Sequence, residues 1–386
     1  MAIAHDELLD DEEYFREPMR RLSQDMRRAA ETMSDAEVRY LIDLYYSQQE
    51  QRKRGDNQLR ASRADGEPNS LTAFLAAQVE ALEGACNGAL QVVARRTRTG
   101  RWCMALKGIS GVLTSGLLAS LDITHAPTAA SFWRFAGLDP TWEWLGKERA
   151  AGLLTELSSV MGGRPRPQEL LEPAARRVAT HPDGLLARIE RQTRPKQARE
   201  AVRTLDEVRG AMTRAQLVAA LATRPWNAGL KTLQWKLMDC LVKVQNRDDA
   251  PYYCAIYQHR KQYEWERNFA GGYADQCTRA LDRNLTVLQR PWYSGQYDPT
   301  VLQPQWQQGM SPSTWKLPEP AEGGVPMLPP GRIELRARRV AVKQFLADLH
   351  YCLYEEHYGR PPAPNALQQA RGKTSFRPPP GWRETE

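Results

Sequence analysis

The sequence predicts an all-α fold. In most segments the apolar residues recur every three or four positions, which is the spacing of a helix with one buried face. No run of alternating apolar and polar residues indicates a β-rich domain, and no internal repeat is found. The chain has 386 residues, enough for two or three domains with a sizeable core.

Changes in composition along the chain predict seven segments. These are an acidic N-terminal arm (1–33), a long helical hairpin (34–99), a helix-hairpin-helix (100–145), an inserted small helical bundle (146–224), a helical core (225–289), an extended Pro- and Trp-rich segment (290–331), and a basic C-terminal helix with its tail (332–386).

The N-terminal arm is distinguished by its charge. Residues 1–18 contain seven acids and one arginine, a net charge of −6, whereas the whole chain carries +7. The remaining residues therefore carry +13, an asymmetry that needs an explanation. A basic body of this kind is compatible with nucleic acid but does not by itself identify the partner.

A capping box begins the predicted hairpin. Ser34 is followed three residues later by Glu37, and helical spacing continues to about Arg54. Asn69 or Ser70 caps a second helix, whose apolar positions are Leu71, Leu75, Leu82, Cys86, Leu90 and Val93. The pair fits an antiparallel hairpin or a coiled-coil dimerisation element, and two ordinary bundle helices fit equally well.

The turn Gly108-Ile109-Ser110-Gly111 separates two short apolar helices. Free backbone N–H groups at the start of the second helix, next to Lys107, would bind a phosphate without reading a base. A tight corner, in which glycine serves only the backbone geometry, fits the same residues equally well.

Two helical segments follow. Residues 146–224 consist of short helical pieces, for which a plain bundle fits better than a DNA-reading helix-turn-helix. Pro225 is suited to the first turn of a strong helix, and another helical run spans about 252–288.

Nine prolines between 290 and 331 predict an extended segment that wraps around the helical body. Three tryptophans of this segment are expected to pin it in place: Trp292, Trp306 and Trp315. The last helix is expected from about Arg332 to Tyr358, before Gly359 and a proline-rich tail.

Basic residues gather at several places. In the last helix four of them are spaced four, three and four apart and so share one face, for which phosphate contact is favoured over an ordinary solvated face. Others precede the glycine turn or lie off the apolar line of the helix after Pro225. The predicted nucleic-acid-binding residues are Arg95, Arg96, Arg98, Arg101, Lys107, Gly108, Ser110, Gly111, Lys231, Lys236, Arg332, Arg336, Arg339 and Lys343.

Several classes of protein are not indicated. The six cysteines are far apart with no C-x-x-C pair, and the six histidines show no H-x-x-x-H, so we expect no metal site and no cofactor. No window approaches 18 consecutive apolar residues, and the acidic N-terminus lacks a signal pattern. These features predict a cytoplasmic location.

Five segments carry a family resemblance. They are the Phe135–Pro140 box, FAGLDP, with the preceding Gly108-Ile109 and Leu117-Leu118, and the runs Tyr40–Arg52, Arg224–Lys236, Tyr253–Glu264 and Leu328–His350. They resemble the IS one-ten insertion-sequence transposases, which are bridge-RNA-guided DEDD-type recombinases. Within that family the chain looks like the transposase-like proteins of phage genomes, over most of residues 36–382.

The departures from the family concern its catalytic parts. The resemblance implies an RNase-H-like domain before the long helices, where only about 33 residues stand here. It also implies a serine before glycine shortly after the FAGLDP box, where Leu145-Gly146 stands. A two-metal carboxylate site needs acids held on rigid elements, and neither element is recognisable.

These observations predict a non-catalytic, nucleic-acid-binding protein of a bacterial mobile element or phage. Its expected partner is DNA, with structured RNA left open by the resemblance, and the long helices predict a homodimer or a higher homo-oligomer. Two alternatives remain: a recombinase or nuclease that works with a partner or guide RNA, and a structural assembly protein.

Overall fold

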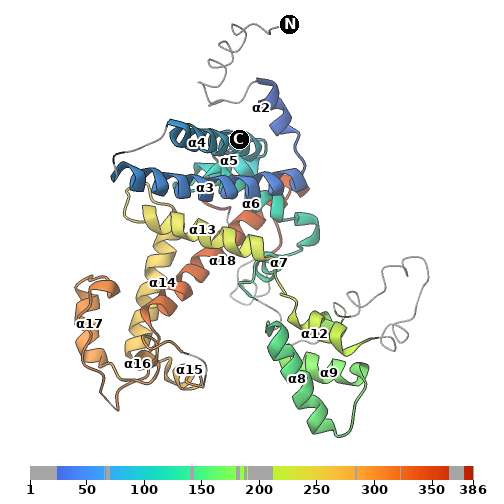
Figure 1. The fold of residues 1–386 in the computed structure, drawn as a ribbon, viewed down its shortest axis with the longest axis vertical. Coiled ribbons are helices and arrows are strands. Elements are labelled where there is room, and N and C mark those ends of the chain that lie inside the picture. Colours follow the sequence, from blue (N-terminus) through green and yellow to red (C-terminus); the bar gives the residue numbers. More distant parts are fainter. Residues whose placement is uncertain are drawn as a thin grey trace. The chain divides into compact units, whose positions relative to one another are not determined.

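The structure, a computed structural model, describes residues 24–64, 66, 70–139, 143–179, 183–186, 189, 212–282, 285–321, 323–364 and 378–385. All regular structure within these ranges is helical and no strand forms, which confirms the all-α prediction (Figure 1). The acidic residues 1–18 lie outside the described residues. The chain forms two compact units, the first from 24–121, 235–364 and 378–385 and the second from 122–234.

The first unit begins with α2 (Gln24–Glu31) and the antiparallel hairpin of α3 (Asp35–Ala64) and α4 (Ser70–Arg95). The predicted capping box is confirmed, because the Ser34 N–H donates to the Glu37 carboxylate over 2.7 Å and the Glu37 N–H donates to the Ser34 hydroxyl over 3.4 Å. Helix α3 continues beyond the expected end near Arg54. Its last turns include Gln58, Arg60 and Arg63, residue types that lose little freedom in a helix.

Two short helices follow the hairpin: α5 (Arg98–Ala105) and α6 (Gly111–Ser120). Each begins at a hydroxyl cap, because Thr97 accepts from the Gly100 N–H and Ser110 from the Leu113 N–H. Helices α2, α3, α4 and α6 share one apolar cluster, formed by Ala30, Val38, Ile42, Leu90, Val93, Val112 and Ala119.

Three long helices complete the first unit: α13 (Ala228–Val244), of which residues 235–244 belong to this unit, α14 (Tyr252–Phe269) and α18 (Pro330–Tyr358). Helix α13 begins three residues later than expected from Pro225, because the Asn227 side chain caps it by accepting from the Leu230 N–H over 3.0 Å. Helices α14 and α18 pack together along their lengths. The Phe345 ring of α18 lies 5.9 Å from Trp102 and 5.3 Å from Tyr253, between centroids.

A partly buried carboxylate lies where α14 meets α18. Asp348 accepts hydrogen bonds from the Tyr253 hydroxyl (2.8 Å) and the Gln344 side-chain amide (2.9 Å). Burial raises the pKa of Asp348 to about 6, although the two hydrogen bonds act in the opposite direction. At neutral pH a charged carboxylate is therefore held in an environment that favours its neutral form.

We expect Asp348→Asn to stabilise the protein at pH 8. The pKa of Asp348 is higher in the folded state than in the unfolded state. Its carboxyl group therefore contributes to stability at low pH, and this contribution is lost as the pH rises through about 6. Asparagine mimics the protonated side chain at every pH, so the variant should gain up to about 3 kcal/mol at pH 8. The gain should disappear at pH 4. Urea unfolding at both pH values measures it, and the same difference at both would contradict a raised pKa.

The proline-rich segment is more helical than expected. It contains α16 (Arg290–Tyr293), α17 (Pro299–Gln307) and a 3-10 turn (Pro312–Thr314), after the short α15 (Ala274–Thr278). Proline at the first turn of α17 favours the helix, since its missing N–H is not needed there. The expected tryptophan anchors lie in one aromatic cluster with Trp265 and Phe269: Trp292 and Trp315 are buried, and the partly buried Trp306 packs against this cluster beside Phe269.

The chain ends in a buried anchor. Trp382 is fully buried, and the carbonyl of Pro380 accepts a hydrogen bond from the Trp102 indole over 2.9 Å. The Trp382 indole donates to Glu355 of α18, and Arg383 forms an ion pair with the same carboxylate at 2.8 Å. Residues 378–385 are therefore part of the core of the first unit.

The second unit contains α7 (Ala129–Phe135), α8 (Gly146–Met161), α9 (Pro167–Val178) and α12 (Arg214–Ala222). Helices α8, α9 and α12 share a core of leucine and alanine side chains. The second helix of the helix-turn-helix alternative lies largely outside the described residues. None of the helices that the structure describes, in either unit, has the length and apolarity needed to cross a membrane.

Candidate nucleic-acid interface

The predicted phosphate turn is a closely packed corner. Gly108 has φ +89°, and a Cβ placed on it would lie 3.2 Å from Val244 and 3.3 Å from the Cys240 carbonyl of α13. A Cβ on Gly111 would lie 2.9 Å from the Cα of Gln91 in α4. Both glycines thus allow backbones to approach each other. Since α4 covers the start of α6, the geometry favours the tight corner over the phosphate cradle.

Most of the basic residues around this corner bind other parts of the chain. Lys107 pairs with Asp249 at 3.2 Å. The Arg98 guanidinium donates to the carbonyls of Trp382 (2.9 Å) and Thr385 (2.6 Å). Its predicted phosphate contact is therefore corrected to a contact with the C-terminal residues.

The N-terminus of α5 already holds a carboxylate. Glu356 of α18 accepts from the N–H groups of Arg98 (2.7 Å) and Thr99 (2.9 Å) and from the Thr99 hydroxyl. A helix N-terminus attracts anions, and here an internal side chain fulfils that role. Of the four arginines before the turn, Arg95, Arg96 and Arg101 are exposed and Arg98 is partly buried. Arg101 donates to the Arg95 carbonyl.

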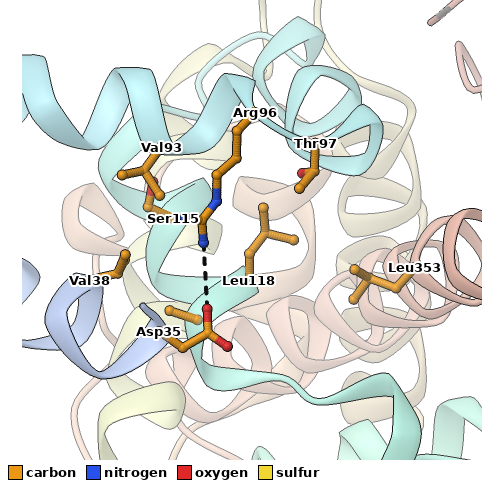
Figure 2. A pocket seen from close by; sticks show the side chains of 9 residues that line it. Asp35, Val38, Val93, Arg96, Thr97, Ser115, Leu118 and Leu353 are labelled. Atoms are coloured by element: carbon orange, nitrogen blue, oxygen red, sulfur yellow. Dashed lines mark ion pairs between the residues drawn. The ribbon is translucent and has the colours of Figure 1, made fainter. Parts of the chain in front are cut away.

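Arg96 closes one wall of a small pocket (Figure 2). It donates to the Met33 carbonyl over 2.6 Å and lies 3.6 Å from the Asp35 carboxylate. The other residues that line the pocket are Val38, Val93, Thr97, Ser115, Leu118, Ala119 and Leu353, and its volume is about 140 Å³. This space suits a few water molecules, and the ion pair with Asp35 already neutralises Arg96.

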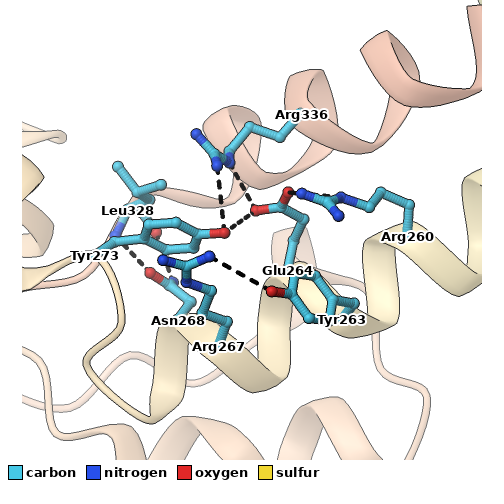
Figure 3. A network of polar contacts seen from close by, with 8 residues as sticks. All are labelled: Arg260, Tyr263, Glu264, Arg267, Asn268, Tyr273, Leu328 and Arg336. Atoms are coloured by element: carbon cyan, nitrogen blue, oxygen red, sulfur yellow. Dashed lines mark hydrogen bonds and ion pairs between the residues drawn. The ribbon is translucent and has the colours of Figure 1, made fainter. Parts of the chain in front are cut away.

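The predicted basic face of α18 leads to a buried carboxylate. Arg336 pairs with Glu264 of α14 at 2.6 Å, and Arg260 pairs with the other oxygen of Glu264 at 2.6 Å. The Tyr273 hydroxyl also donates to Glu264 (Figure 3). Burial alone would raise the pKa of Glu264, but the hydrogen bonds from Tyr273 and the arginines outweigh it and lower this pKa. Arg336, predicted to bind nucleic acid, thus pairs with Glu264 and remains about one-third exposed.

Tyrosine rings alternate with arginines around Glu264, as Figure 3 shows. The Arg336 and Arg267 guanidinium carbons lie 4.5 and 4.8 Å from the Tyr273 ring centroid. Arg260 lies 4.6 Å from the exposed ring of Tyr263, whose hydroxyl accepts from Arg267 over 3.4 Å. These contacts hold the guanidinium planes in fixed orientations.

Two further arginines of α18 extend this region. Arg332 and Arg339 are exposed and share a helix face with Arg336, at spacings of four and three residues. We call the five residues Arg260, Arg267, Arg332, Arg336 and Arg339 the arginine surface. Of the acids on the same stretch of α14, Glu264 is buried and Glu266 is exposed, so the arginine surface keeps an excess of positive charge.

Only the α18 half of the arginine surface was predicted from the sequence. Arg260, Tyr263 and Arg267 are spaced three and four apart, which places them on one face of α14. That spacing was a usable signal, but residues 252–288 were assigned only as a helical run. Tyr273 lies beyond the end of α14, and only folding brings it to Glu264.

The remaining predicted lysines pack against rings or are partly covered. Lys236 lies 2.9 Å from the Tyr46 ring centroid, and desolvation followed by repulsion from Lys53 lowers its pKa. In the second unit Lys231 lies 4.1 Å from the Trp226 ring centroid. Lys343 is half-buried on α18. Of the three, only Lys231 is exposed, and it belongs to the second unit.

Among the described residues, no group of three or more His, Cys, Asp or Glu side chains is placed to hold a metal ion. Comparisons of the chain with known protein families, with curated proteins and with solved structures find no match. The family resemblance therefore rests on the sequence segments alone.

Proposed function

We propose that this chain is a non-catalytic nucleic-acid-binding protein that holds phosphates through the arginine surface. The observation that carries the proposal is the alternation of arginines and tyrosines on α14 and α18. Kinship with the recombinases of mobile elements, suggested by the resemblance, is part of the same proposal.

The chemistry of the arginine surface suits a nucleic acid. Guanidinium groups make paired hydrogen bonds to phosphate oxygens, and exposed aromatic rings stack on unpaired bases. Tyr263 is 41% exposed between Arg260 and Arg267, so its ring is accessible for stacking. DNA with an unpaired or branched region is therefore the proposed partner, and binding to a structured RNA is measured for comparison.

The test measures binding and its salt dependence. We expect the full chain to bind fluorescent single-stranded, duplex and four-way-junction DNA and a hairpin RNA in anisotropy titrations at low salt. The variant Arg267→Ala/Arg332→Ala/Arg339→Ala should bind at least about tenfold more weakly at moderate salt. For duplex DNA its slope of log K against log salt should be smaller by about 3, because three phosphate contacts are lost. These side chains avoid the Glu264 ion pairs, so the fold should persist.

A matched control removes the same charge elsewhere. The variant Lys147→Ala/Arg164→Ala/Arg247→Ala replaces three exposed cations outside the arginine surface and should bind nearly as the wild type does. If both variants weakened binding equally, net charge alone would explain the loss of affinity. That result would overturn the assignment of binding to the arginine surface. Absence of binding to every probe at low salt would overturn the proposed function.

A further inference from the structure

The apolar stripe of α4 is covered over only half of its length. Leu90 and Val93 in the C-terminal half are buried in the cluster with α2, α3 and α6. In the N-terminal half Leu71, Leu75 and Leu82 are 61%, 54% and 45% exposed. The sequence pattern placed all five residues on one side of the helix, so the exposed leucines continue a core stripe beyond its cover.

The hairpin closes without these leucines. At its outer end Gly55 of α3 faces Ala76 of α4, where a Cβ on the glycine would lie 3.7 Å from the alanine Cβ. Farther along, Arg52 of α3 pairs with Glu83 of α4 at 2.6 Å. Small residues and this ion pair thus form the α3 side of α4. The exposed leucines lie on a different face, about 90–130° farther around the helix.

We propose that the exposed half of α4 pairs antiparallel with the same helix of a second copy of this chain. Its positions 71, 75, 78 and 82 are spaced four, three and four apart, the spacing of a helix–helix seam. An antiparallel pair centred on Gln78 places Leu71 opposite Ala85 and Leu75 opposite Ala81. In the same register Leu82 lies opposite Phe74, which is 36% exposed. Leu71 and Leu75 thus meet small side chains, and Leu82 meets an aromatic ring.

The charges of α4 permit this pairing. Between Ser70 and Ala85 the only charged residues are Glu80 and Glu83, and neither belongs to the seam. Glu83 is already paired with Arg52. At the centre two Gln78 side chains can hydrogen-bond to each other. A seam of about three helical turns buries less surface area than a standard interface, which buries about 800 Å² per partner. We therefore expect a dimer with a dissociation constant in the micromolar range.

Sedimentation velocity of the full chain, without nucleic acid, tests the pairing. We expect concentration-dependent dimerisation, and the variant Leu75→Glu/Leu82→Glu should weaken it by at least about 100-fold, because four carboxylates would be buried in the seam. The control Val287→Glu/Leu288→Glu changes two apolar residues that are 88% and 82% exposed outside the hairpin and should leave dimerisation unchanged.

Engineered cysteines test the orientation. The native cysteines are buried or partly buried, so Gln78→Cys should give a covalent dimer under mild oxidation, with the wild-type chain as background. Leu71→Cys should not, because antiparallel helices place the two introduced thiols about 20 Å apart. Cross-linking at 71 and not at 78 would overturn the antiparallel pairing.

A chain that stays monomeric at about 100 µM, or a charged variant that dimerises like the wild type, would overturn the proposal while leaving nucleic-acid binding untouched.

Discussion

Replacing Trp382 by alanine is expected to destabilise the first unit by about 3–5 kcal/mol, the range for removing a large buried aromatic side chain. Trp382 is fully buried, its indole donates to Glu355, and the Arg98 guanidinium carbon lies 4.1 Å from the centroid of its ring. The substitution leaves a cavity and removes the anchor of residues 378–385. Arg98 and Glu355 would each lose a partner in the same step.

Urea unfolding followed by far-UV circular dichroism measures this loss. Trp235→Ala is the matched control, because Trp235 is 55% exposed and is expected to cost less than about 1 kcal/mol. Comparable losses in the two variants would contradict the inclusion of residues 378–385 in the core. Trp382→Phe should fall between the wild type and the alanine variant, because it retains most of the apolar volume and loses the hydrogen bond to Glu355.

The second large effect is expected at Glu264. Replacing it by glutamine removes the carboxylate that pairs with both Arg260 and Arg336 and accepts from Tyr273. Breaking a fully buried ion pair costs about 3–5 kcal/mol. The arginine side chains are about one-third exposed, so solvent reduces the expected loss of unfolding free energy to about 2–3 kcal/mol.

Two further variants show whether unpaired charge causes this loss. Arg336→Met in the Glu264→Gln background should recover part of the stability, because it removes one of the cations left without a carboxylate. Glu172→Gln is the surface control: its pair with Arg176 is exposed on both sides and should contribute less than about 1 kcal/mol. A Glu264→Gln loss no larger than that of Glu172→Gln would contradict a structural role for the Glu264 network.

The helices were predictable from sequence because their signals are local. The capping box at Ser34 and Glu37 uses side chains three residues apart, and both hydrogen bonds form as expected. Apolar spacing marked α4, α13 and α18 to within a few residues. Errors occurred where a local signal competed with a neighbouring cap, as at Asn227, or where proline was taken as a helix breaker although it stands in the first turn of α17.

The candidate site was predicted only in part. The spacing of Arg332, Arg336 and Arg339 correctly placed three cations on one helix face, because that depends only on helix geometry. It could not show that Arg336 meets Glu264, 72 residues earlier in the chain. For the same reason Arg98 was assigned to a phosphate although its partners are Trp382 and Thr385. Partners distant in sequence leave no periodic signal.

The sequence by itself determined the helical class, the approximate positions of the long helices, and the sign and rough location of the charge. These follow from propensity, capping and spacing, which act within a few residues. Only the tertiary structure decided which cations face solvent, that the glycine turn is a packed corner, and that half of the α4 stripe stays uncovered. Those properties depend on which distant elements meet, and a carboxylate or an aromatic ring brought there by folding changes what each basic residue can bind.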